Sequence, residues 1–249
     1  MGDFFVTILY QPIFNGVIGL YNLIPDIGAV ILIITVIIKL ALYPMTTKSI
    51  KAQKSLSDLQ PKLADLKKKH TDKQVLAQET MKLYKEHKVN PFGSCLPLLI
   101  QLPIFIALYW VLKDVFTADR FDLLYTFVSQ PESINPMSLG FINLAEINPF
   151  LAVCAGLSQF WQAKMFQKKK APEKAGKGAK DENMMAMMNK QMLYFMPVMT
   201  FFIGLTLPGG VTLYWFLSTL TTALQQKFLF NKKTAPADGV IEGEIVDKK

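Results

Sequence analysis

Long apolar runs alternate with polar, lysine-rich stretches along most of the chain. Five of these runs are of the length that a helix needs to cross the hydrocarbon core of a membrane, about 17–25 residues. They cover residues 26–44, 91–112, 149–166, 191–207 and 211–230. The pattern therefore predicts an all-α, polytopic membrane protein with five transmembrane helices.

The N-terminal residues 1–25 are also apolar, but polar residues and a proline interrupt them. Pro12 would remove a hydrogen bond from the interior of a spanning helix. Four large side chains fall on one helical face, which are Phe14, Val17, Ile18 and Tyr21. We expect an amphipathic helix that lies in the interface on the external side of the membrane. The alternative is that this segment is a sixth span.

The composition changes sharply in residues 45–90, where lysines surround a narrow apolar seam. The seam has helical spacing and consists of Leu56, Leu59, Leu63 and Leu66. Thr71 and Asp72 supply a turn with helix-capping chemistry. A second helix then follows, with its own apolar side formed by Leu76, Leu83 and Tyr84. This segment is typical of an antiparallel helical hairpin.

The connecting segments set the expected orientation. Residues 113–148 form a mixed-charge loop, residues 167–190 a basic linker of small residues, and residues 208–210 a tight turn. The hairpin, the linker and the tail 231–249 contain lysines, whereas residues 1–25 and the turn contain none. The positive-inside rule places the N-terminus outside and the C-terminus in the cytoplasm.

The composition agrees with a membrane protein, since 51% of the residues are hydrophobic. The net charge of +8 comes almost entirely from lysines beside the apolar runs, because Arg120 is the only arginine. That placement indicates membrane topology and contact with acidic surfaces rather than nucleic-acid binding. Met1–Asp3 lacks the basic start of a cleavable signal peptide, and no organelle import signal is evident. We expect a multi-pass protein of the bacterial cytoplasmic membrane.

One positive charge interrupts the first predicted span. Lys39 lies in an otherwise apolar run, and a lysine at the centre of a spanning helix costs about 2.5–3.5 kcal/mol. Thr35, four residues earlier, lies on the same helical face. Gln101 and Gln159 add amides to the second and third predicted spans. Either Lys39 extends to the lipid headgroups, or it faces a wet site inside the protein.

The last predicted span carries a semi-polar stripe that includes Tyr214, Trp215 and Ser218. Taken singly, such residues often join helices or anchor them at the interface. Together with Lys39 they indicate a polar concavity that opens toward the cytoplasm and the lipid. A fixed positive charge without carboxylates suits the transient reception of polar or acidic segments.

Several classes of chemistry lack their usual residues in the sequence. No aspartate or glutamate lies in the interior of the five predicted spans, where proton-coupled transporters usually place them. His70 and His87 lie in the hairpin without a further metal ligand at coordinating spacing. No nucleophile–base pairing and no phosphate-binding glycine loop is present. We therefore expect no enzyme activity, no metal site and no cofactor.

Three stretches of the sequence carry distinctive motifs. The first consists of Thr35–Pro44 followed by Gln60–Lys62, and the second is Asn90–Phe105. The third combines Leu207–Gly210 with Leu213–Trp215 and ends in Gln225 and Gln226. These stretches occur in the same order as in the YidC/Oxa/Alb family of membrane protein insertases, which the sequence resembles over nearly the whole chain.

This resemblance implies a five-helix core with a hydrophilic groove that is closed to the outside. In the family the position of Lys39 is a groove arginine, and Thr35, Gln159, Tyr214 and Trp215 match other groove positions. Lysine keeps the charge but lacks the planar fork of a guanidinium. The sequence resembles a minimal version of the family, without a large external domain.

The resemblance also implies an insertase that uses no energy source. It would receive the hydrophilic segments of nascent membrane proteins and release their spans into the lipid bilayer. The implied partners are these clients, a ribosome and a targeting receptor that bind weakly to the hairpin and tail, and a Sec translocon. Two other classes stay open: a channel or small-solute transporter, and an assembly scaffold that would tolerate neutralisation of Lys39.

Overall fold

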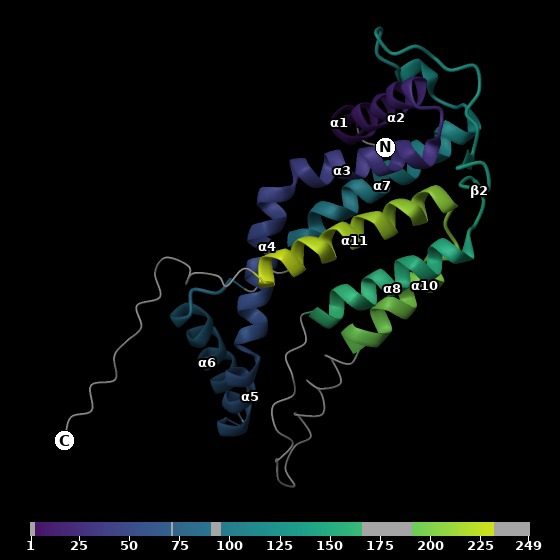
Figure 1. The fold of residues 1–249 in the computed structure, drawn as a ribbon. Coiled ribbons are helices and arrows are strands. Elements are labelled where there is room, and N and C mark those ends of the chain that lie inside the picture. Colours follow the sequence, from purple (N-terminus) through teal and green to yellow (C-terminus); the bar gives the residue numbers. More distant parts are fainter. Residues whose placement is uncertain (1–2, 71, 91–95, 166–190, 232–249) are drawn as a thin grey trace, which may run out of the picture.

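The structure is a computed structural model that describes residues 3–70, 72–90, 96–165 and 191–231. It is mostly helical, which confirms the predicted all-α class (Figure 1). The predicted linker 167–190 and the tail beyond Asn231 lie outside the described residues, as does the start of the predicted span 91–112.

The bundle is formed by five segments with these bounds: α3 (Ile27–Ala41), α7 (Leu96–Thr117), α8 (Pro149–Met165), η4 with α10 (Gln191–Phe195 and Met196–Gly204) and α11 (Gly209–Asn231). Helix α11 packs against α3, α7 and α8, and α10 packs on the far side of α8. Helix α7 runs past the expected end at 112 to Thr117, and Asp114 in its last turn accepts a hydrogen bond from the Tyr10 hydroxyl at 2.6 Å.

The helices α8 and α10 approach each other closely because glycines lie at their contact. A Cβ atom on Gly204 would lie 3.0 Å from the Cβ of Ala152, and one on Gly156 would lie 3.2 Å from the Pro197 carbonyl oxygen. Small residues of this kind allow helix backbones to pack tightly where no hydrophobic force drives association in lipid. The glycines therefore set the distance between the two helices.

The chain bends sharply after α3. Helix α4 (Tyr43–Asp58) continues from α3 at an angle of 69°. Pro44 lies in its first turn, where its missing N–H is tolerated but the preceding helix cannot continue straight. Lys39 thus lies in the last turn of α3, just before the bend.

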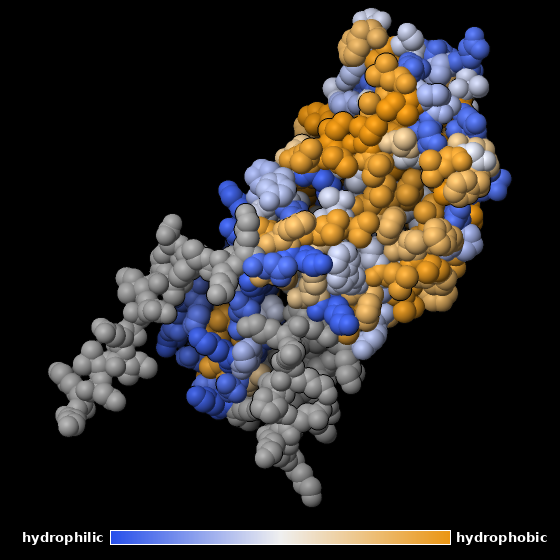
Figure 2. Space-filling view, in the orientation of Figure 1, coloured by the Kyte–Doolittle hydropathy of each residue, from blue (hydrophilic) through white to orange (hydrophobic). Residues whose placement is uncertain are grey.

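Beyond α4 the chain forms the helical hairpin of α5 (Gln60–Lys69) and α6 (Lys73–Glu86). Leu59 and Leu63 of the predicted seam are buried. The Asp72 side chain accepts a hydrogen bond from the backbone amide of Gln74 at 2.7 Å, and this bond is the predicted helix cap. Burial raises the pKa of the Tyr84 phenol. We call this end of the molecule the hairpin end; it is strongly hydrophilic in Figure 2.

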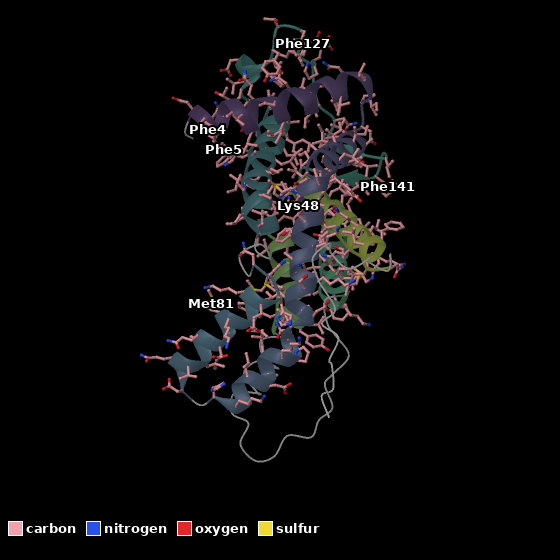
Figure 3. The ribbon with its side chains drawn as sticks, turned by 90° about the vertical axis from the view of Figure 1, so that its left-hand side faces the viewer. Phe4, Phe5, Lys48, Met81, Phe127 and Phe141 are labelled. Carbon is pink, nitrogen blue, oxygen red and sulfur yellow. The ribbon has the colours of Figure 1, made fainter. Side chains whose placement is uncertain are left out.

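The N-terminal segment is almost continuously helical, with α1 (Asp3–Phe5), η1 (Val6–Tyr10) and α2 (Gln11–Leu23). Its buried face includes the four residues predicted from the pattern, Phe14, Val17, Ile18 and Tyr21. It packs against α3 and α7 and lies across them in Figure 3. By length and composition alone, Asp3–Leu23 could also cross a membrane.

The count of five spans stays a prediction. Within the described residues, two helical stretches are long and apolar enough to cross a membrane, Asp3–Leu23 and Leu99–Thr117. A third joins them if the bent pair α3–α4 is one span. Helix α8 has only 17 residues, and the polar stripe of α11 lowers its hydropathy.

The far end of the bundle, which we call the loop end, is covered by residues 118–148. This segment contains a short helix η3 (Phe121–Leu123) and a two-stranded antiparallel hairpin of β1 (Met137–Ser138) and β2 (Ile142–Asn143), which the all-α prediction missed. The amides of Gly209 and Gly210 donate to the carbonyl oxygens of Glu146 at 2.7 Å and Leu144 at 2.8 Å. Loop carbonyls thus satisfy the free amides at the start of α11.

Candidate functional site

Lys39 makes its contacts with two other helices. Its Nζ donates to the Oγ1 of Thr222 on α11 at 3.0 Å and to the Oε1 of Gln101 on α7 at 3.3 Å. The side chain is half-buried, and both acceptors are uncharged. These bonds bring the predicted charge inward, between three helices, rather than along the helix surface toward the headgroups.

Gln101 connects Lys39 to the polar stripe of α11. Its Nε2 donates to the phenol oxygen of Tyr214 at 2.6 Å, and its Oε1 accepts from the Ser218 hydroxyl at 3.4 Å as well as from Lys39. We define the polar cluster as Lys39, Gln101, Tyr214, Ser218 and Thr222. Its members come from α3, α7 and α11, so only the folded bundle brings them together.

Three predicted residues lie outside this polar cluster, namely Thr35, Gln159 and Trp215. The Thr35 hydroxyl is buried and donates to the Ile31 carbonyl oxygen of its own helix at 2.6 Å. Gln159 is half-buried on α8, which packs against the other side of α11. The structure therefore brings three of the predicted side chains together around Lys39 and leaves Thr35 and Gln159 apart. The third residue outside the cluster, Trp215, packs against Phe105.

Aromatic rings border the polar cluster on the side of the loop end. Phe105 packs against Tyr214 and Trp215, with ring centroids 6.4 Å and 5.3 Å apart. Phe105 lies four residues after Gln101, so both side chains share one face of α7. Sequence reasoning missed Phe105 and did not select Thr222 as a site residue. The spacing of Thr222 from Ser218 on one helical face was the signal that could have identified it.

A second set of hydrogen bonds lies beside the bend, toward the hairpin end. The Gln225 Nε2 donates to the hydroxyl oxygens of Thr47 at 2.9 Å and Thr46 at 3.1 Å. These bonds fasten the first turn of α4 to α11, three residues beyond Thr222. They hold the direction in which the chain leaves the polar cluster.

A layer of apolar side chains separates the polar cluster from the loop end. Ile31, Leu108, Leu112 and Val211 are at most 1% exposed and belong to one core cluster. They come from the same three helices as the polar cluster, but lie closer to the loop end. The polar cluster is thus closed on this side by packed hydrocarbon.

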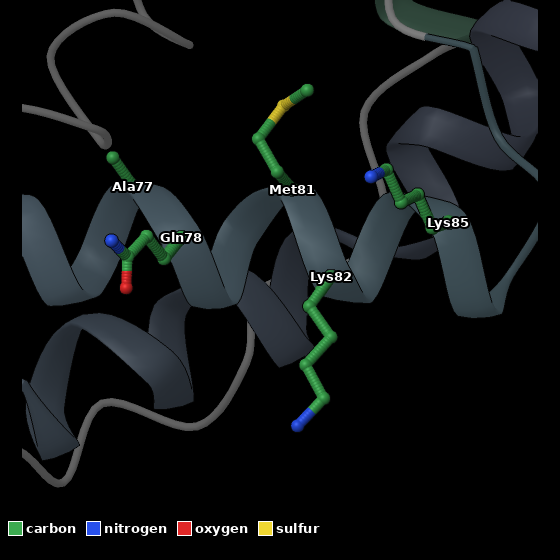
Figure 4. A pocket seen from close by; sticks show the side chains of 5 residues that line it. All are labelled: Ala77, Gln78, Met81, Lys82 and Lys85. Atoms are coloured by element: carbon green, nitrogen blue, oxygen red, sulfur yellow. The ribbon is translucent and has the colours of Figure 1, made fainter.

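The surface hollow shown in Figure 4 lies elsewhere. It is formed on α6 by Ala77, Gln78, Met81, Lys82 and Lys85, and it shares no residue with the polar cluster. Met81 is 52% exposed there. Within residues 3–70, 72–90, 96–165 and 191–231, no group of three or more His, Cys, Asp or Glu residues could hold a metal ion.

Comparison with known proteins places this arrangement in a family. Residues 19–236 match the model of the 60 kDa inner membrane protein family. The chain belongs to this family. Its relatives include proteins of similar length and much longer ones.

A relative from Fusobacterium nucleatum, a membrane protein insertase YidC, is 37% identical and is matched over 83% of this chain and 87% of its own length. The insertases YidC of Tolumonas auensis and Haemophilus influenzae are 31% and 33% identical. The chain spans only 37% and 36% of those two relatives.

The fold also resembles a solved family structure. A crystal structure of an active YidC insertase aligns with a TM-score of 0.57 and 24% sequence identity. The alignment covers 91% of this chain and 47% of that chain. The helical architecture of the described residues is therefore the architecture of this family.

Proposed function

We propose that this protein is a membrane protein insertase whose receiving site is the polar cluster around Lys39. The observation that carries the proposal is a lysine amine inside an apolar bundle, held only by the uncharged oxygens of Gln101 and Thr222 among the described residues. The names of its relatives support the same activity. The site would open toward the cytoplasm and lipid, with the N-terminus outside.

A charge held by neutral acceptors is suited to transient binding. Each such hydrogen bond contributes only about 0.5–3 kcal/mol net, so an incoming segment can replace it. A client carboxylate about 4 Å from the amine would gain roughly 4 kcal/mol at an intermediate effective dielectric constant. That gain offsets part of the desolvation of a polar client flank, while burial of the apolar client span in lipid drives insertion.

The apolar layer of Ile31, Leu108, Leu112 and Val211 favours this function over a channel. A channel or small-solute transporter needs a water path through the protein, whereas these side chains fill the space between the three helices on the loop side. An insertase needs the polar site to be open on one side of the membrane only.

The partners follow from the same proposal. Nascent membrane proteins would enter from the hairpin end, where the exposed lysines of α6 would meet a ribosome, a targeting receptor or a Sec translocon. The tail is a weaker ribosome contact, since beyond Asn231 its lysines (Lys232, Lys233, Lys248 and Lys249) are matched in number by acidic residues (Asp238, Glu242, Glu244 and Asp247).

The test is insertion of a short single-span client with an acidic flank into liposomes that carry the purified protein. We compare the wild type with Lys39→Arg, Lys39→Ala and Lys39→Glu. We expect Lys39→Arg to retain insertion, and Lys39→Ala and Lys39→Glu to reduce it at least tenfold, because the receiving charge is removed or reversed.

A client with a neutral flank is the matched control, and its insertion should depend much less on Lys39. Equal insertion of the acidic client by all four variants would show that Lys39 is not the receiving charge. Ion flux through the same liposomes would instead support a channel.

A further inference from the structure

The tip of the β-hairpin at the loop end exposes two large apolar side chains. Leu139 is 71% exposed and Phe141 is 72% exposed. In Figure 3, Phe141 lies at the edge of the molecule and points away from the helices. Neither side chain contributes much to the core of this chain, so their surroundings outside the chain decide what they do.

The backbone of this tip favours different residues. Leu139 and Gly140 have φ values of +53° and +79°, and the Phe141 amide donates to the Ser138 carbonyl oxygen at 3.2 Å. These are the features of a type I′ turn, for which Asn-Gly is the preferred pair. A leucine with positive φ costs roughly 1–2 kcal/mol. Packing within the chain does not repay this cost, because the side chain is exposed.

The tip is also fixed in place. Asp26, at the start of α3, accepts a hydrogen bond from the Leu139 amide at 2.7 Å and another from the Ser138 hydroxyl at 2.8 Å. A Cβ on Gly28 would lie 2.0 Å from the Ser138 Oγ, so only glycine lets the strand approach α3 this closely. These contacts therefore fix the position of Leu139 and Phe141 relative to α3.

The exposed apolar surface of the tip continues along the chain onto α8. Ile147 is exposed in the connection, and Phe150, Val153 and Leu157 are exposed at helical spacing on one face of α8. A stripe of this kind on a bundle helix of a membrane protein faces lipid. Residues 142–149 connect the tip to this stripe along the chain.

We propose that the turn Leu139–Phe141 inserts into the boundary between headgroups and acyl chains, and anchors the loop end in the bilayer. The occupant is lipid, because the tip is apolar and exposed and is joined by a short connection to the apolar stripe of α8. The bilayer supplies the hydrophobic burial, about 1.5–3 kcal/mol for each large side chain, that this chain does not provide. The anchor fixes the loop end against the membrane while the hairpin end handles clients.

The test uses single-cysteine variants with a nitroxide label, in full-length protein whose Cys95 and Cys154 are replaced by serine. Leu139→Cys and Phe141→Cys are compared with Glu132→Cys, an exposed position of the same loop. The protein is placed in phosphatidylcholine vesicles at high dilution in lipid. Collision of the label with oxygen and with a water-soluble nickel chelate is measured.

We expect labels at Leu139 and Phe141 to collide at least threefold more with oxygen, relative to the nickel chelate, than the label at Glu132. Equal accessibility at all three positions would overturn the proposal. Spin–spin broadening at Leu139 that persists at high lipid dilution would also overturn it, since a second copy would then cover the tip.

A second measurement guards against damage from the cysteine replacements. Leu139→Asn in the otherwise natural chain keeps the turn and relieves its strain. We expect this variant to melt no lower than the wild type in detergent, but lower than the wild type in lipid nanodiscs. An equal shift of the melting temperature in detergent and in nanodiscs would contradict a lipid anchor. Neither measurement involves a client, so neither depends on the proposed function.

Discussion

Gln101 shows how single residues make a charge tolerable inside an apolar bundle. Its amide oxygen accepts from Lys39 and Ser218, and its amide nitrogen donates to Tyr214. One side chain thus serves three partners from two other helices. The sequence marked Gln101 as a polar residue at membrane depth, but its partners follow only from the way α3, α7 and α11 pack.

We predict that Gln101→Leu destabilises the protein by about 1–3 kcal/mol, because buried polar groups lose their partners. Thermal unfolding in detergent measures this effect. Gln159→Leu is the matched control, since Gln159 is a half-buried glutamine of a bundle helix outside the network. Equal destabilisation by both substitutions would show that the network contributes nothing specific. Gln101→Leu should also reduce insertion of the acidic-flank client.

At the scale of helices, the contact between α8 and α10 depends on glycine. We predict that Gly204→Ala lowers the free energy of unfolding by about 1–3 kcal/mol, because the added methyl group would lie 3.0 Å from the Ala152 Cβ. Thermal unfolding in detergent measures this effect.

Gly19→Ala is the matched control for this prediction. A Cβ at Gly19 meets no atom within 4 Å, so the substitution should stabilise α2 by up to about 1 kcal/mol through helix propensity. If Gly204→Ala and Gly19→Ala change the free energy of unfolding equally, the close approach of α8 and α10 does not limit stability.

At the scale of the whole molecule, charge and hydrophobicity separate along its length. On the face shown in Figure 2, apolar surface predominates over the middle of the bundle, whereas hydrophilic residues gather most densely over α5 and α6 at the hairpin end. Helix α6 and the residues just after it carry three exposed lysines, Lys82, Lys85 and Lys88. We therefore expect contacts with acidic partners at the hairpin end.

We predict that replacing Lys82, Lys85 and Lys88 with glutamine reduces co-sedimentation with ribosomes at low salt, and reduces its dependence on salt, because fewer counterions are released. Deletion of 232–249 should have a smaller effect, because the charges of that segment balance. If the triple variant binds ribosomes as well as the wild type, the hairpin is not the ribosome contact. If only the deletion reduced co-sedimentation with ribosomes, the ribosome contact would lie in the tail.

The sequence alone determined the helical class, the family resemblance, the position of the charged residue in the first predicted span and the apolar face of α2. These features depend on composition and on local periodicity, which a single segment carries. The helical hairpin was visible for the same reason, since its seam and its Asp72 cap are local signals.

The tertiary structure decided which polar residues meet. Lys39 and Thr222 are 183 positions apart in the chain, so no local pattern relates them. Thr35 and Gln159 looked equivalent to Gln101 in sequence, yet one bonds to its own helix and the other lies on α8. The turn at Leu139 was likewise invisible, because Asp26 holds it from the start of a distant helix. Long-range packing therefore decides which of several polar residues become hydrogen-bond partners, and the sequence pattern alone does not distinguish them.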